Sequence, residues 1–166
     1  MRRLVSILCL LAATCLFTIG CGVKLFPDVH FAFKTTGGAG GYNENITEFV
    51  VGKRFYTAIT VWLTTDTSWR SPEYRVVIEV PRTKEVEVEE HGGLGYDSKE
   101  WDFYNQLTRL TYNMKGNEKA LREKILFHGT PIGEGQATMK VKIYNKEGQL
   151  LHWYYKNIYF KYDITE

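Results

Sequence analysis

The clearest pattern in this chain is a strict alternation of side chains between residues 54 and 63. One set of positions carries Phe, Thr, Ile, Val and Leu, and the positions between them carry Arg, Tyr, Ala, Thr and Trp. Side chains of a β-strand alternate between its two faces, and β-branched and aromatic residues are favoured on a pleated, half-buried surface. The pattern therefore predicts a strand that fits a buried surface, with Phe55, Thr57, Ile59, Val61 and Leu63 on one face.

Other segments follow the same period of two. The segment at 73–80 ends at Pro81, which cannot donate to a strand ladder. Residues 107–128 are interpreted as a hairpin, with a helical turn allowed at its start because Trp101 and Leu107 also fit a helical stripe. Further strands are predicted over 28–34, 83–90, 136–144 and 149–162. About seven short strands separated by turns predict an all-β, two-sheet β-sandwich.

The predicted strand at 83–90 places three carboxylates, Glu85, Glu87 and Glu89, on one face. Calcium sites draw their oxygens from a tightly folded loop, whereas alternate residues of a strand are about 7 Å apart. We interpret this strand as a solvated edge whose charge prevents pairing with other molecules. A calcium site or a surface for a basic partner is the alternative.

The last third of the chain contains a well-defined hairpin. Residues 136–144 alternate, Asn145 to Gly148 form a four-residue connection, and a long strand follows. This pattern, Gly135-Gln-Ala-Thr-Met-Lys-Val-Lys-Ile-Tyr-Asn-Lys-Glu-Gly148 before a long strand, resembles the last hairpin of immunoglobulin-like domains. The resemblance covers about 30 residues and implies an immunoglobulin-like fold, without any function.

The first 22 residues differ in composition from the rest. Arg2 and Arg3 precede an uncharged apolar run from Leu4 to Ile19, which is the layout of a secretory signal peptide. The run ends in Thr18-Ile19-Gly20-Cys21-Gly22, which resembles the bacterial lipobox. The resemblance implies that a diacylglycerol is attached to the Cys21 sulfur and that the leader is cleaved just before it. Cleavage by an ordinary signal peptidase, leaving a soluble secreted protein, is the alternative.

This leader determines the expected location of the protein, the fate of its cysteines and the start of its folded domain. Cys9 and Cys15 lie within it, so a cleaved chain keeps Cys21 alone, and a single thiol cannot form an intrachain disulfide. We expect the protein in the bacterial cell envelope, bound to a membrane through the lipid on Cys21. The expected parts are a lipoprotein signal peptide at 1–20, a lipid-anchored tether at 21–27 and a β-sandwich domain at 28–166.

The charge of the chain excludes one class of partner. The excess of 21 basic over 19 acidic residues comes from Arg2 and Arg3, so the cleaved chain has equal numbers of both. Nucleic-acid binding depends on a surplus of basic side chains that neutralise phosphates. We therefore expect no nucleic acid among the partners.

No motif for catalysis or metal binding is evident. The four histidines, His30, His91, His128 and His152, show no metal-ligand spacing, and no serine lies in a Gly-x-Ser-x-Gly elbow. A glycosidase needs two facing carboxylates, and Asp97, Glu100 and Asp102 beside Trp101 are the available candidates. We interpret these as an acidic loop, and we expect no metal and no cofactor.

Aromatic residues are the enriched feature, at 14% of the chain. Trp69 lies in a polar loop, and Trp153, Tyr155 and Tyr159 share one face of the last strand. If that face points outward, its rings form a platform for proteins or sugars. We favour the inward orientation, because aromatic side chains commonly fill the interior of a sandwich.

These observations give three functional hypotheses. The first is a non-enzymatic envelope lipoprotein that binds another envelope protein or stabilises an assembly. The alternative is a carbohydrate-binding sandwich that uses Trp69 and the face of Trp153, Tyr155 and Tyr159. The third is an enzyme or metal carrier built from the histidines and the loop carboxylates.

Overall fold

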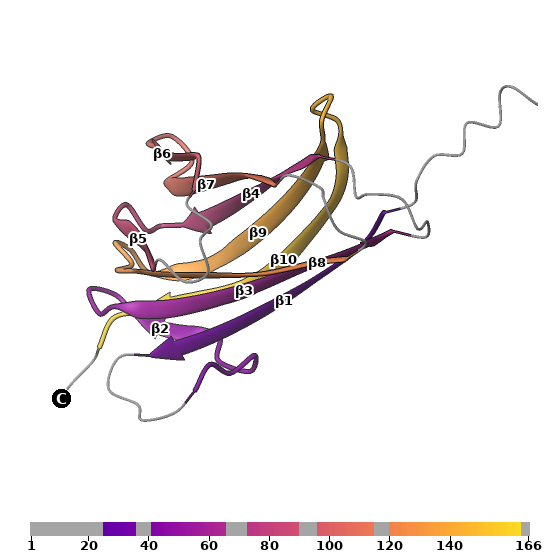
Figure 1. Ribbon diagram of the computed structural model, residues 1–166. Coiled ribbons are helices and arrows are strands. Elements are labelled where there is room, and N and C mark those ends of the chain that lie inside the picture. Colours follow the sequence, from indigo (N-terminus) through magenta and orange to yellow (C-terminus); the bar gives the residue numbers. More distant parts are fainter. Residues whose placement is uncertain (1–24, 36–40, 66–72, 90–95, 115–119, 164–166) are drawn as a thin grey trace, which may run out of the picture.

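The computed structural model describes residues 25–35, 41–65, 73–89, 96–114 and 120–163, and these form two packed β-sheets (Figure 1). The described residues contain ten strands and no helix. The strands are β1 (Leu25–Thr35), β2 (Glu48–Val50), β3 (Phe55–Thr65), β4 (Tyr74–Pro81), β5 (Val86–Glu89), β6 (Ser98–Asp102), β7 (Leu107–Met114), β8 (Ala120–Gly129), β9 (Gly135–Asn145) and β10 (Leu150–Lys161).

The strands are arranged as a sandwich of a four-stranded and a six-stranded sheet. Their orders are β1-β3-β8-β5 and β2-β10-β9-β4-β7-β6. Neighbouring strands are antiparallel, except that β2 runs parallel to β10. The chain is thus an immunoglobulin-like two-sheet β-sandwich, as the sequence predicts, with ten described strands instead of about seven. The sequence missed β2 and β6, which are too short to show a clear period.

The alternating positions of both sheets meet in one core. Phe55, Ile59 and Val61, which share one face of β3 as predicted, are buried, and Val76 and Ile78 of β4 face them from the other sheet. Four phenylalanines close one region of this core, with ring centroids 4.8 to 6.1 Å apart where they pair. They come from both sheets and are Phe33, Phe49, Phe55 and Phe160.

The predicted hairpin over 107–128 is wrong. Strand β7 pairs with β4 and β6, whereas β8 pairs with β3 and β5, so the chain crosses between the sheets instead of turning back on itself. Residues 115–119, which connect these strands, lie outside the described residues. The physical reason for this crossing is burial of apolar side chains. Leu110 of β7 and Phe127 of β8 enter the same core, but they do so from opposite sheets.

At the start of this region, where the sequence allows a helical turn, residues 103–106 form a turn that connects β6 to β7. The Asp102 carboxylate accepts hydrogen bonds from the backbone N–H and the side-chain amide of Asn105, at 3.0 and 2.8 Å. Aspartate favours turns through such local bonds. Gln106 then has a positive φ of 49°, which ends the turn and starts β7.

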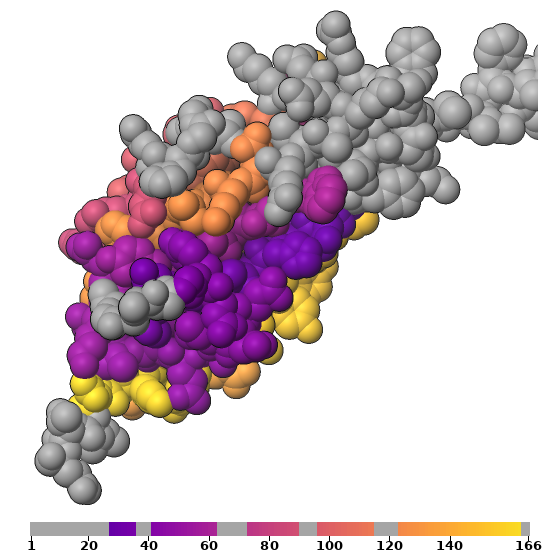
Figure 2. All heavy atoms as spheres, turned by 60° about the horizontal axis from the view of Figure 1, so that its bottom comes forward, coloured from indigo at the N-terminus to yellow at the C-terminus, as the bar shows by residue number. Residues whose placement is uncertain are grey.

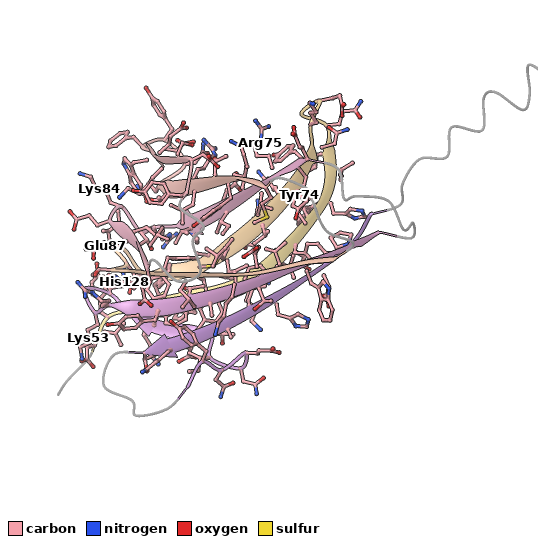
Figure 3. The ribbon with its side chains drawn as sticks, in the orientation of Figure 1. Lys53, Tyr74, Arg75, Lys84, Glu87 and His128 are labelled. Carbon is pink, nitrogen blue, oxygen red and sulfur yellow. The ribbon has the colours of Figure 1, made fainter. Side chains whose placement is uncertain are left out.

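Two other local predictions are confirmed. Strand β5 lies at an edge of the four-stranded sheet, although it is limited to Val86–Glu89, and Glu87 on it lies 3.5 Å from the ring nitrogen of His128 (Figure 3). The connection from β9 to β10 is the expected turn, with Gly148 at a φ of 81° and its N–H bonded to the Asn145 carbonyl at 3.0 Å.

The leader 1–20 and Cys21 lie outside the described residues, so cleavage and lipidation stay predictions. The described part of the chain contains no helix long and apolar enough to cross a membrane.

Candidate interaction surface

The aromatic face of β10 points outward. The side chains of Trp153, Tyr155 and Tyr159 are 55, 56 and 45% exposed, whereas Ile158 and Phe160 on the opposite face are buried. The inward orientation favoured from the sequence is therefore wrong. Figure 2 shows side chains of β10, in yellow, at the rim of the molecule beside those of β1, in indigo.

A β-bulge at the start of β10 sets this orientation. Leu150 pairs with Tyr144, but His152 pairs with Ile143, so one extra residue enters β10 between them. Shifting a strand by one residue turns every following side chain to the other face. Without the bulge, Trp153 would lie opposite the buried Val141. With it, Trp153 lies opposite Lys142, whose side chain is on the outer face.

The two central rings of this face are stacked on each other. The ring centroids of Trp153 and Tyr155 are 5.5 Å apart and their planes differ by 26°. At that separation, nearly parallel rings overlap face to face with an offset, which is a favoured aromatic arrangement. The pair therefore forms one block of aromatic surface, and its two rings do not lie side by side in one plane.

Lysine side chains border the aromatic rings. Lys142 lies opposite Trp153 and Lys140 lies opposite Tyr155 in the β9–β10 pairing. Further along, Thr138 donates a hydrogen bond of 3.0 Å to the Asn157 side chain. We define the β10 outer face as the residues that these strands present together, which are Trp153, Tyr155, Asn157, Tyr159, Lys140 and Lys142.

A buried carboxylate neutralises one of the two lysines. Glu79 of β4 is 7% exposed although it lies on the outer face of the sheet, because cationic side chains cover it. Its oxygen accepts hydrogen bonds from Lys142 Nζ at 2.7 Å and Arg109 Nε at 3.4 Å. Burying a carboxylate without such partners would be costly. Lys140, in contrast, has no ion pair with the described residues.

Arg109 extends this network to β6. Its guanidinium lies 3.0 Å from the Asp102 carboxylate. Hydrogen bonds from the side chain and the backbone of Asn105 hold the pKa of Asp102 below its usual value, and Arg109 lowers it further. Asp102 is thus a structural carboxylate that fixes a turn and an arginine.

The inner side of β10 fixes the strand against the other sheet. The Tyr154 hydroxyl donates a hydrogen bond of 2.6 Å to the Pro27 carbonyl of β1. Burial is the main cause that raises the pKa of Tyr154, and Asp28 adds to it. Because both ends of this contact are in strands, the outer face is presented on a rigid element.

The remaining sequence candidates do not gather at one place. Trp69 and His91 lie outside the described residues. His30 contacts Asp28 at 2.9 Å, and His128 contacts Glu87. Across the described ranges, no group of three His, Cys, Asp or Glu side chains is placed to hold a metal ion.

Two of the three carboxylates considered for glycoside hydrolysis, Asp97 and Asp102, have structural contacts. Asp97 accepts a hydrogen bond from the backbone N–H of Asn113, and Asp102 binds Asn105 and Arg109. A concavity of about 240 Å3 lies elsewhere, beside the Asn145–Gly148 turn. It includes Arg75, which lies on the opposite face of β4 from the buried Tyr74 (Figure 3).

Comparison with known proteins finds likeness to solved structures alone. No protein-family model matches it, and no curated protein matches its sequence. Among solved structures, the CARDB domain of a Pyrococcus furiosus protein, in complex with di-metal ions, is 12% identical with a TM-score of 0.44 over 83% of this chain and 96% of that one. The C-terminal domain of AspA, an antigen I/II-family protein of Streptococcus pyogenes, is 13% identical with a TM-score of 0.47, over 80% and 45%.

A third solved structure is similar to a comparable degree. An uncharacterised Nocardia farcinica protein with an immunoglobulin-like fold is 10% identical with a TM-score of 0.44, over 74% of this chain and 81% of that one. At these identities the likeness concerns the fold alone and implies no function for this chain.

Proposed function

We propose that this chain is a non-enzymatic protein-interaction module of the bacterial cell envelope, held at a membrane through a lipid on Cys21. The observation that carries the proposal is the outward orientation of Trp153, Tyr155 and Tyr159, which are about half exposed. Large aromatic side chains are enriched at the centres of protein interfaces, where they lose little conformational entropy on binding. A rigid strand presents them here, and lysines border them.

The ring geometry favours a protein partner over a sugar. A platform that stacks on consecutive sugar rings needs aromatic faces that lie side by side in one plane. Trp153 and Tyr155 instead cover part of each other's faces at a centroid distance of 5.5 Å. A stacked pair of this kind fits as one block into a pocket or against an apolar side chain of a partner protein.

The anchor would keep this surface close to a membrane. Leu25, the first residue of β1, follows Cys21 by four residues. An extended chain covers at most about 3.6 Å per residue, so β1 would start within about 14 Å of the lipidated cysteine. This short distance favours a partner that is itself in or on the membrane.

The test is cross-linking in intact cells, followed by affinity purification of the chain and mass spectrometry. We expect one dominant envelope protein with the wild type, and at least a tenfold loss of it with Trp153→Ala/Tyr155→Ala. The matched control is Phe103→Ala/Tyr104→Ala, which removes another contacting aromatic pair that is 75 and 95% exposed. Cys21→Ala should release the chain from the membrane fraction and reduce the adduct.

Two results would contradict the proposal. An adduct that both aromatic double variants retain would exclude the β10 outer face as the binding surface. Absence of any adduct above background would count against the proposal. If glycans then bound the chain on an array and quenched its tryptophan fluorescence in solution, and Trp153→Ala removed that quenching, the carbohydrate-binding alternative would be favoured.

A further inference from the structure

Among the described strands, β10 has one edge that is paired over only part of its length. On the side away from β9, its C-terminal end is covered by β2, where the Tyr159 N–H donates to the Thr47 carbonyl at 2.7 Å. The Lys161 carbonyl accepts a hydrogen bond from the Val51 N–H at 2.9 Å on the same side. Strand β2 pairs with residues 159–161 of β10 and with no earlier residue. The covered part of this edge is therefore short.

The backbone groups of the preceding residues face the same side. N–H and C=O groups alternate between the two sides of a strand with a period of two, so those of Trp153, Tyr155 and Asn157 point the same way as those of Tyr159. No strand among the described residues pairs with them there. Unpaired N–H and C=O groups on a strand edge are a template for another strand.

We propose that this edge accepts an extended, acidic segment of a partner protein as an added strand of the six-stranded sheet. This inference rests on the proposed function and names how the partner binds. Main-chain hydrogen bonds to Trp153, Tyr155 and Asn157 provide the register, and alternate side chains of the segment lie beside the stacked rings.

Charge indicates an acidic segment. Strands β9 and β10 contain four lysines and no acidic residue. Lys142 and Lys161 bind Glu79 and Glu48, whereas Lys140 and Lys156 have no ion pair with the described residues. Lys140 lies on the outer face and Lys156 lies on the opposite side of the sheet, with Ile158. An added strand would lie next to Lys156 of β10, and Lys140 would lie one strand further away on the outer face, so both ammonium groups favour acidic side chains on the segment.

The same charges disfavour a second copy of this chain as the occupant. Antiparallel pairing of two β10 edges over residues 153–157 would bring Lys156 of both copies close together, and that part of the strand contains no carboxylate. Like charges across an interface oppose association. An acidic strand from a different protein has the complementary charge.

The experiment uses the full chain, purified from membranes in detergent, and a displayed library of random nonapeptides. Selected peptides should alternate β-branched with acidic residues, and a synthetic peptide of the selected sequence should bind at least tenfold more tightly than its Glu→Lys twin. Hydrogen exchange should show at least tenfold protection of the Trp153, Tyr155 and Asn157 amides when that peptide is bound.

A matched pair of variants distinguishes the contribution of the Tyr155 backbone N–H to peptide binding from that of its aromatic ring. Tyr155→Ala and Tyr155→Pro both remove the aromatic side chain, but only proline removes the N–H. That N–H points away from β9, so proline there leaves the β9 ladder intact. Tyr155→Pro should lose peptide binding at least tenfold relative to Tyr155→Ala, while thermal unfolding shows that both variants fold.

Three results would overturn the inference. The first is that the library yields no peptide that protects these amides. The second is that the Tyr155→Ala and Tyr155→Pro variants bind the peptide equally well. The third is that light scattering shows the wild type to be a dimer and the Tyr155→Pro variant to be a monomer. If the edge fails while the cellular adduct still depends on Trp153 and Tyr155, the proposed function stands and only strand addition is excluded.

Discussion

We expect Phe49→Ala to lower the free energy of unfolding by about 3–5 kcal/mol, because removing a buried ring loses its burial and leaves a cavity. Phe49 is 2% exposed, and its ring centroid lies 5.3, 4.8 and 6.1 Å from those of Phe33, Phe55 and Phe160. The cluster joins the two sheets, so neighbouring side chains cannot close the gap without moving strands. Urea unfolding followed by circular dichroism measures the loss.

The matched control is Phe103→Ala, which removes the same ring from a position that is 75% exposed. Its effect should stay within about 0.5 kcal/mol, as for most surface substitutions. A loss below about 1 kcal/mol for Phe49→Ala would mean that β2 is not packed into the core as described.

The second large effect is expected at Gly129, the last residue of β8. A Cβ atom there would overlap Cγ2 of Thr83 and lie 3.1 Å from the Glu85 carbonyl oxygen. Thr83 cannot easily move, because its hydroxyl donates to the Pro81 carbonyl at 2.9 Å and its carbonyl accepts from Thr108 at 2.6 Å. We expect Gly129→Ala to lower the free energy of unfolding by about 1–3 kcal/mol, as overpacking does.

The double variant Gly129→Ala/Thr83→Ser tests this cause directly. Serine keeps the hydroxyl that binds Pro81 and removes the Cγ2 atom that the new Cβ would meet. The double variant should recover at least half of the stability lost by Gly129→Ala, and residues in contact are expected to show such coupling. Strictly additive losses in denaturant unfolding would show that the Thr83 methyl is not the obstacle.

Much of the fold could be predicted because its strands alternate strongly. Phe55, Ile59 and Val61 in β3 share one face, as their period of two indicates, and the structure buries that face. The turn at Asn145–Gly148 could be placed because glycine there takes a positive φ. Local chemistry of this kind depends on neighbouring residues alone, so one sequence is sufficient to detect it.

The surface of β10 could not be predicted for a definite reason. Both faces of this strand carry aromatic residues, so hydrophobicity does not distinguish Trp153 and Tyr155 from Tyr154 and Phe160. The face is set by the bulge between Leu150 and His152, which shifts the pairing with β9 by one residue. No local pattern in the sequence marks that bulge, and its effect on orientation is complete.

Strand pairing between segments that are distant in the sequence is the other feature that could not be predicted. The strands around residues 107–128 were detected, but their apolar faces fit a hairpin as well as two separate sheets. The choice depends on contacts with β3 and β4, which lie far away in the sequence. The ion pairs of Glu79 with Lys142 and Arg109 depend on the same long-range register.

The central claim is that the β10 outer face contacts a protein in the cell envelope, and site-specific photocross-linking tests it most directly. A benzophenone amino acid replaces Tyr155 in one strain and Tyr104, which is 95% exposed, in another. After irradiation of living cells, we predict one discrete protein adduct from position 155 and none from position 104. Equal adducts from both positions, or an adduct from position 104 alone, would contradict the claim.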